Sequence, residues 1–423
     1  MEAIRTYLTK HAPGDSLIVS EPEKELKYIV VIPSYLETRL EESLVSLFDA
    51  SLPTMPVEII VVINWPEDES GENIRLSRET LISAREWARQ HSSEKKQFHV
   101  IDAGFIPRKK AGVGYARKTG LDEAVRRFLR AGQHNGILIS FDADTRCETN
   151  YLEAIENHFL LNPYADGCSI YFEHPMKGDA YSPEVYRAIV QYELHMRCYL
   201  HAIRHSGFPN AFYTVGSAFA VRANSYCRQG GMNTRKAGED FYFLQKFFDL
   251  GNFTDLLSTR VVPSPRPSLR VPFGTGKAID QLLKSRDSLK SYNPETYSIL
   301  AGFFALAPKM YEQIKNSGNT DLKGLHPCLQ EYLTELDFEE EILEIYRNSG
   351  SQDTFVKRVH RYFNMFRILK FAKHARNTFP DLPVALCAKA IMETTGMAGS
   401  KEMSEMDMLL EFRRKDKGIS VQQ

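Results

Sequence analysis

The sequence predicts an α/β fold in which a mixed, mainly parallel sheet with helical crossovers is followed by a C-terminal α-helical module. In the first half of the chain, short apolar runs rich in β-branched residues alternate with segments of helical periodicity, which is the rhythm of a parallel sheet. Beyond Ala278, helical periodicity is nearly continuous. The 423 residues also exceed the roughly 250 to 300 at which a single hydrophobic core stops growing, so two parts are expected.

Five apolar runs are expected to form the strands. They cover residues 28–33, 57–63, 98–101, 137–141 and 168–172. Between the first two runs, Leu40, Leu44 and Leu47 recur on one helical face, and Leu121 and Phe128 do the same before the fourth, so the crossovers are helical. In an open sheet of this kind, ligands bind beyond the carboxyl ends of the strands. The polar residues found there are residues 34–37, Asn64, Asp102 and residues 142–144.

The chain is expected to divide into three regions. An N-terminal helical extension covers residues 1–26, the α/β domain covers residues 27–277, and the helical module covers residues 278–423. Residues 262–276 hold four prolines and two glycines, which is typical of an irregular loop at the boundary. A long helix is expected over residues 181–203. The helices of the module are expected over residues 278–292, 295–316, 329–348, 354–379, 384–395 and 403–414.

Charge and composition exclude several classes of protein. With 53 basic and 54 acidic residues, the chain lacks the positive excess that draws proteins onto nucleic acid. Its longest uncharged apolar run, residues 297–308, is far shorter than the roughly 20 residues of a membrane-spanning helix. The N-terminus lacks the pattern of a secretory signal, so a cytoplasmic protein is expected. The six cysteines are widely spaced and form no zinc-binding motif.

Two carboxylates follow the fourth predicted strand. Asp142 and Asp144 come after the apolar residues 136–140, and side chains two apart in an extended chain point the same way, so both face one side. Carboxylate oxygens suit Mg²⁺ and Mn²⁺, which complete their coordination shell with water and substrate phosphates. The pattern predicts a metal site, and the alternative is a chance Asp-x-Asp in a turn.

A second acidic pair begins a predicted helix. Glu239 and Asp240 follow Gly238, and apolar residues recur at helical spacing from there to Gly251. Acidic residues in a first turn are favoured by the helix dipole by about 0.3 to 1 kcal/mol without any catalytic role. The functional interpretation is that the dipole keeps Asp240 ionised, ready to take a proton from an attacking hydroxyl.

Together with three further motifs, these pairs resemble the family 2 glycosyltransferases of the GT-A fold over roughly residues 28–251. Residues 30–37 are similar to that family's first strand and Pro-x-Tyr-Asn-Glu turn, with Leu36 in place of Asn. Asn64 stands where the family has acidic residues. Residues 114–124 resemble its Gly-x-Ala-x-Ala-Arg-Asn-x-Gly helix, from which Lys118 and Thr119 depart. The Asp-x-Asp at 142–144, a strand and turn over 216–231 and the acidic pair at 239–240 follow in the family's order.

The resemblance implies a Rossmann-like, nucleotide-sugar-binding GT-A domain and a hexosyltransferase-type enzyme. Its donor is expected to be a nucleotide sugar, first a UDP-sugar, and its acceptor a hydroxyl of a saccharide, glycolipid or small molecule, as in polysaccharide or glycolipid biosynthesis. Mn²⁺ or Mg²⁺ is implied at Asp142 and Asp144, with Asp240 as the general base and Glu239 shaping the acceptor site. The donor-binding residues implied or expected are Pro33, Tyr35, Glu37, Asn64, Arg117, Asp142, Arg266, Arg270 and Lys277.

The last three of these donor-binding residues lie outside the strongest part of the resemblance. Arg266, Arg270 and Lys277 surround the glycine-rich residues 273–276. Such a loop could close over the donor diphosphate with its cations and exclude water. A solvated linker between domains explains the same residues equally well.

Missing motifs exclude other nucleotide-binding and hydrolytic classes. The first strand-to-helix turn, residues 33–37, has no glycine, so the dinucleotide fingerprint is absent, and no P-loop or His-Glu-x-x-His motif occurs. Retaining GT-A enzymes commonly add a late His metal ligand, but no His lies between His205 and His326, so inversion is favoured. A retaining transferase, a nucleotidyltransferase and a non-catalytic scaffold are the alternatives.

Basic residues are frequent in the predicted helix over residues 354–379. They are Lys357, Arg358, Arg361, Arg367, Lys370, Lys373 and Arg376. An amphipathic helix with a solvated basic face explains them. The alternative is a surface for peripheral contact with anionic, lipid-linked acceptors.

Overall fold

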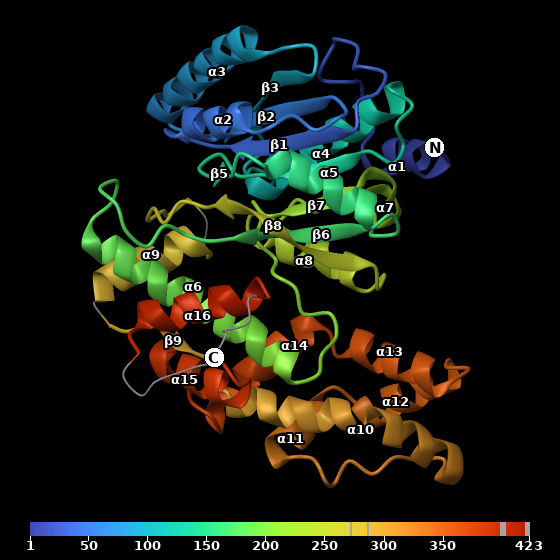
Figure 1. The fold of residues 1–423 in the computed structure, drawn as a ribbon. Helices are drawn as coiled ribbons and strands as arrows, with labels where there is room; N and C mark the ends of the chain where they lie inside the picture. The colour runs from blue at the N-terminus through green and yellow to red at the C-terminus, as the bar shows by residue number, and fades with distance from the viewer. Residues whose placement is uncertain (271–272, 286, 398–402, 419–423) are drawn as a thin grey trace. The chain divides into compact units, whose positions relative to one another are not determined.

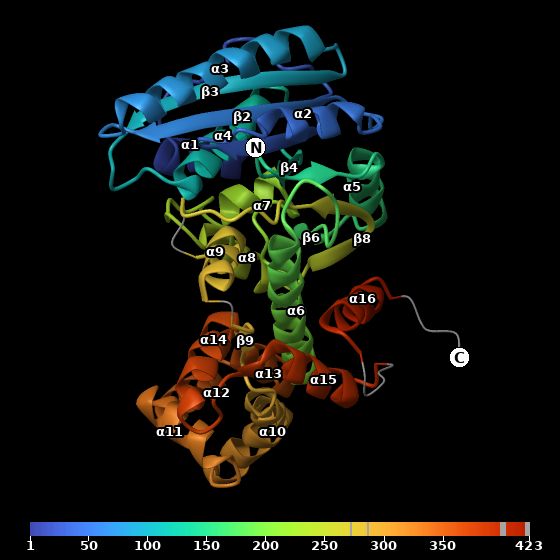
Figure 2. The same cartoon turned by 90° about the vertical axis from the view of Figure 1, so that its left-hand side faces the viewer.

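The computed structural model describes residues 1–270, 273–285, 287–397 and 403–418 (Figures 1 and 2). The chain folds into two compact units. The sheet unit consists of Met1–Val185 and Tyr213–Asp280, and the helical unit consists of Tyr186–Phe212 and Gln281–Gln423. Among the described residues, no helix offers an apolar stretch long enough to cross a membrane.

This division differs in two places from the three regions that the sequence predicts. The N-terminal extension belongs to the sheet unit, because helix α1 (Glu2–His11) buries Tyr7, whose hydroxyl donates a 2.7 Å hydrogen bond to Asp122. Residues 186–212 belong to the helical unit, because α6 (Pro183–His205) is joined to the C-terminal helix α16 (Glu405–Asp416) by buried charges. There the fully buried Arg197 forms an ion pair with Asp416.

The sheet unit contains a mixed eight-stranded sheet in the order β3-β2-β1-β4-β7-β6-β8-β5. Strands β3, β2, β1 and β4 run parallel, as do β6 and β8, whereas β7 runs antiparallel to β4 and β6. The predicted mixed, mainly parallel α/β fold is therefore confirmed. The strands are β1 (Tyr28–Ser34), β2 (Val57–Pro66), β3 (Lys96–Ile106), β4 (Ile137–Ser140), β5 (Arg146–Cys147), β6 (Gly167–Phe172), β7 (Phe219–Arg222) and β8 (Phe253–Val262).

Helix α4 packs directly on the parallel half of the sheet (Figure 1). A Cβ at Gly120 would lie 2.4 Å from Cγ1 of Val31 on β1 and 2.9 Å from Cγ2 of Val62 on β2, so this close approach requires glycine. The helices of the unit are α1, α2 (Leu40–Asp49), α3 (Gly71–His91), α4 (Val113–Arg130), α5 (Tyr151–Leu161), α7 (Ala223–Arg228) and α8 (Glu239–Phe248).

In the helical unit, two of the helices predicted from the sequence are each interrupted, and a third is shorter than predicted. The segment 329–348 is interrupted at Asp337, whose φ of 51° leaves the helical region. The segment 354–379 is interrupted at Asn364, whose side chain caps the next helix. Helix α9 (Thr275–Ser285) stops short of residue 292. Figure 2 shows α10 to α15 of this unit packed together. They are α10 (Glu295–Ser317), α11 (Pro327–Glu335), α12 (Phe338–Arg347), α13 (Gln352–Tyr362), α14 (Met365–His374) and α15 (Val384–Thr394), with the strands β9 (Lys290–Ser291) and β10 (Leu382–Pro383) and a 3₁₀ turn, Ala375–Asn377.

A buried histidine makes the stability of the sheet unit depend on pH. His99 on β3 is 14% exposed, and its Nε2 lies 3.8 Å from Oε2 of Glu58 without a hydrogen bond to any of the described residues. Burial together with the charge of Arg127 lowers the pKa of His99 from 6.5 to about 4. As the pH falls, the unfolded chain takes up this proton first, so stability is lost from about pH 6.5 down to about pH 4. The loss amounts to about 3 kcal/mol at most.

We therefore expect His99→Asn to flatten the acid side of the stability profile. Urea unfolding of wild type and variant at pH 7 and pH 4.5 measures the effect, because the wild type should lose more free energy of unfolding between the two values. Equal losses in both proteins would show that folding does not lower the pKa of His99.

Candidate active site

The carboxyl ends of three neighbouring parallel strands meet at one edge of the sheet. Strand β1 lies between β2 and β4, with Ser34 opposite Ile63 and Val31 opposite Ser140. The residues that follow these strand ends therefore lie side by side. They are Tyr35 and Glu37 after β1, Asn64 near the end of β2, and Asp142 and Asp144 after β4.

Arg117 connects the Asp-x-Asp segment to the second acidic pair. Its guanidinium, on α4, pairs through Nη2 with Asp142 and through Nη1 with Glu239 at the start of α8. The side chains of Arg117 and Glu239 are 2% and 4% exposed, so this ion pair is buried. Asp240 lies close by, because a Cβ at Gly216 would come within 2.9 Å of Arg117 and 3.2 Å of Asp240. The two acidic pairs, whose nearest members Asp144 and Glu239 are 95 residues apart in the sequence, thus meet in space.

Helix α8 positions the second acidic pair through its first turn. It begins after Gly238, which has a φ of 66° that glycine adopts without strain. Its apolar face buries Phe243, Leu244 and Phe247 against the core, so the first turn is fixed at the edge of the site. Burial raises the pKa of Asp240, and the charge of Arg117 acts in the opposite direction. A carboxylate with a raised pKa is a stronger base.

The loop after β8 contributes two arginines to the first acidic pair. Arg266 pairs with Glu37 and its Nη2 lies 3.6 Å from Oδ2 of Asp144. Arg270 Nη2 lies 3.0 Å from Oε2 of Glu37, and its Nη1 donates a 2.7 Å hydrogen bond to the carbonyl oxygen of Tyr35. Both cations therefore lie at the edge of the sheet where the Asp-x-Asp segment ends.

The charges of this cluster are suited to a divalent cation. Five carboxyl groups meet three guanidinium groups, which leaves two carboxyl groups in excess when all are ionised. Burial, and after it the negative charges of the nearby Asp142 and Glu37, raise the pKa of Asp144 to about 6. The Asp144 side chain is 27% exposed, so an ion could reach it. The carboxyl groups are those of Glu37, Asp142, Asp144, Glu239 and Asp240, and the guanidinium groups are those of Arg117, Arg266 and Arg270.

Three of the remaining predicted site residues form none of the described ion pairs of this cluster. Pro33 lies within β1 opposite Val62 and is buried in the sheet. Lys277 lies 3.9 Å from Asp280 of its own helix, α9. Asn64 is 3% exposed in β2. Their predicted roles in donor binding stay predictions.

Two residues of the site were not identified from the sequence. Glu69 accepts a hydrogen bond from the Tyr35 hydroxyl and another, 2.9 Å long, from Nδ2 of Asn73. Gly216 leaves room for Arg117 and Asp240. Glu69 lies in a polar segment without a motif, so only the fold could reveal it. Gly216 lies three residues before β7, within the segment 216–231 in which the sequence predicts a strand and turn but no role for Gly216.

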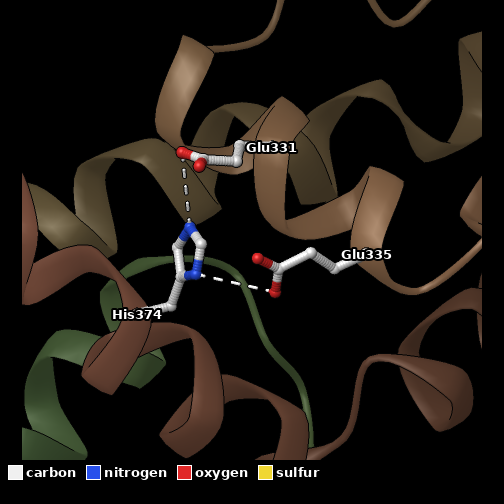
Figure 3. A group of neighbouring side chains, drawn as sticks. All are labelled: Glu331, Glu335 and His374. Carbon is white, nitrogen blue, oxygen red and sulfur yellow. Dashed lines mark ion pairs between the residues drawn. The ribbon is translucent and has the colours of Figure 1, made fainter.

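A different group of side chains has the spacing of a metal site. Among the described residues, the three or more His, Cys, Asp or Glu side chains whose ligand atoms lie within 4.8 Å of one another are Glu331, Glu335 and His374 of the helical unit (Figure 3). Each ring nitrogen of His374 faces one carboxylate at 3.7 Å. The glutamates are 71% and 59% exposed, which is typical of surface ion pairs. Asp142 and Asp144 do not belong to a group of this size.

No protein-family model and no curated protein matches the chain. Solved structures are similar over most of its length. Residues 1–349 of S. aureus TarS, in complex with UDP-GlcNAc, are 12% identical, with 90% of this chain and 95% of that chain covered and a TM-score of 0.38. The mannosyltransferase PcManGT from Pyrobaculum calidifontis, in complex with GDP-Man and Mn²⁺, is 14% identical, with 98% and 92% covered and a TM-score of 0.37.

Proposed function

We propose that the protein is a glycosyltransferase that moves a sugar from a nucleotide-sugar donor, first a UDP-sugar, to an acceptor hydroxyl. The observation that carries this proposal is the meeting of two acidic pairs at the carboxyl edge of a parallel sheet. Asp142 and Asp144 follow β4, which lies next to β1 in the sheet. Arg117 pairs with Asp142 on one side and with Glu239, the neighbour of Asp240, on the other. Such an edge is where open α/β sheets bind nucleotides.

Asp144, with Asp142 beside it, would hold Mn²⁺ or Mg²⁺. Hard carboxylate oxygens, two carboxyl groups in excess and the raised pKa of Asp144 fit a divalent cation. When bound, such an ion neutralises the charge of the departing nucleoside diphosphate. Asp142 forms a close ion pair with Arg117, whereas Asp144 lies 3.6 Å from Arg266, so Asp144 is the more weakly paired of the two carboxylates.

The protein's own cations complete the donor side. Arg266 and Arg270 now neutralise Glu37, and guanidinium groups bind phosphate oxygens in the same forked geometry. A donor bound at the strand ends would bring its diphosphate close to these two arginines. Their ion pairs with Glu37 would then be replaced by contacts with phosphate oxygens. Tyr35, which follows β1, and Asn64, near the end of β2, would contact base and ribose.

Asp240 would act as the general base. In an inverting transfer, Asp240 takes the proton of the acceptor hydroxyl as its oxygen attacks the anomeric carbon. The bond from that carbon to the diphosphate oxygen breaks on the opposite face. The electron pair leaves with the nucleoside diphosphate, and the proton stays on the Asp240 carboxyl group. Glu239, fixed by Arg117, would shape the acceptor side.

The proposal is tested by a thermal-shift panel of UDP, GDP, UDP-glucose, UDP-galactose, UDP-N-acetylglucosamine and GDP-mannose, each with and without Mn²⁺. A ligand that binds only the folded state raises the midpoint of unfolding. We expect a shift that needs both Mn²⁺ and a nucleotide, and release of nucleoside diphosphate rather than pyrophosphate on turnover. Absence of any shift with every nucleotide contradicts the proposal, and release of pyrophosphate would favour a nucleotidyltransferase.

A further inference from the structure

We propose that Arg117 is a positioning residue that holds the donor-side carboxylate Asp142 and the acceptor-side carboxylate Glu239 in one fixed arrangement, and thereby sets where Asp240 stands relative to the donor. The inference rests on the proposed function. It assigns Arg117 a role different from the donor contact that the sequence predicts, because both terminal nitrogens of the guanidinium are engaged by carboxylates of the protein.

The two carboxylates that Arg117 joins come from separate segments of the chain. Asp142 lies in the turn after β4, and Glu239 lies in the first turn of α8. The Arg117 guanidinium is rigid and planar, so it fixes the direction of both partners, which a flexible lysine cannot do. The Arg117 side chain is only 2% exposed, and water therefore cannot take its place easily.

The backbone around Arg117 leaves room for this arrangement. A Cβ at Gly216 would lie 2.9 Å from Nη2 of Arg117 and 3.2 Å from Oδ2 of Asp240, which would push the two groups apart. A Cβ at Gly114 would lie 2.2 Å from the carbonyl oxygen of Arg235. Glycine at 114 thus lets the first turn of α4 approach the segment that precedes α8. Both glycines serve the contact between α4 and α8.

Loss of Arg117 also leaves buried carboxylates without a partner, which destabilises a protein whatever its function. A matched control is therefore required, and the same helix supplies one. Arg127 is fully buried and pairs with both carboxylate oxygens of Glu58. It lies ten residues further along α4, a rise of about 15 Å, and contacts none of the acidic pairs of the site through its described ion pairs.

The test measures the release of nucleoside diphosphate by wild type and variants. The donor is the nucleotide sugar that gives the largest thermal shift in the panel, Mn²⁺ is present, and water is the acceptor. The rates are divided by the folded fraction from circular dichroism. We expect Arg117→Ala to lower kcat about 100-fold, the cost of misplacing a catalytic group by about 1 Å, and to raise the KM for the donor. Arg127→Ala should leave kcat within about twofold, and Arg117→Lys should recover only part of the loss.

A second pair of variants changes geometry without changing charge. Gly216→Ala should lower kcat at least tenfold, whereas Gly71→Ala should leave it unchanged, because a Cβ at Gly71 meets nothing within 4 Å. If Arg117→Ala does not fold, the comparison of Gly216→Ala with Gly71→Ala tests the role of Arg117 instead. Equal kcat per folded molecule in Arg117→Ala and Arg127→Ala, or an unaffected Gly216→Ala, overturns the inference. A wild-type protein that releases no nucleoside diphosphate from any donor contradicts the proposed function, and the inference with it.

Discussion

Asp240→Asn is expected to lower the rate of nucleoside diphosphate release about 10²- to 10⁴-fold, the usual contribution of general base catalysis. The amide keeps the shape of the carboxylate but cannot accept the proton of the attacking hydroxyl. In the proposed site Asp240 serves the acceptor and not the donor, so donor affinity should change little. The measurement is kcat with the panel donor, together with calorimetric titration of the corresponding nucleoside diphosphate.

Asp68→Asn serves as the control for this substitution. Asp68 is 42% exposed and pairs with Arg108 at the surface of the same unit, so its loss should leave kcat unchanged. A kcat within about twofold of wild type in Asp240→Asn would show that another group accepts the proton. The proposed assignment of the general base would then be wrong.

Asp144→Asn is expected to remove the dependence of nucleotide binding on Mn²⁺. Asp144 is the more weakly paired carboxylate of the two, since Asp142 forms a close ion pair with Arg117 and Asp144 lies 3.6 Å from Arg266. The loss of a group outside the coordination shell already lowers metal affinity about 10- to 100-fold, so the loss of a direct ligand should cost at least about 100-fold. Calorimetric titration of UDP, with Mn²⁺ and with a chelator, measures the effect.

The wild type should bind UDP much more tightly with Mn²⁺ than with the chelator, and Asp144→Asn should bind it weakly in both. Glu331→Gln is the informative control, because Glu331 belongs to the other group of possible metal ligands. If Glu331→Gln abolishes the Mn²⁺ dependence while Asp144→Asn keeps it, the metal site has been placed in the wrong unit.

The position of the acidic pairs could be predicted to a large extent from the sequence. The apolar runs that became β1, β2 and β4 are buried throughout, so their lengths and their polar ends are visible in the pattern of residues. In parallel strands those ends lie at one edge, which brings Asn64 and Asp142 together without knowledge of side-chain packing. Strand β8 was missed because it is only partly buried, with Asp255 and Ser258 among its exposed or half-buried positions.

The partners of the charged residues could not be predicted. Arg117 and Glu239 are 122 residues apart, and nothing in the local sequence indicates that they form an ion pair. The same holds for Arg266, which is 229 residues from its partner Glu37. The number of excess carboxyl groups, and hence the fit to a divalent cation, depends on these long-range pairs. It follows from the fold and not from any motif.

The central claim is that Asp142 and Asp144 hold a divalent cation against the diphosphate of a donor while Asp240 stands on the acceptor side. Anomalous scattering from crystals grown with UDP and MnCl₂ tests it most directly. We expect a manganese peak within bonding distance of a carboxylate oxygen of Asp144 and beside the diphosphate. Manganese at Glu331, Glu335 and His374, with no nucleotide beside Asp142 and Asp144, would contradict it.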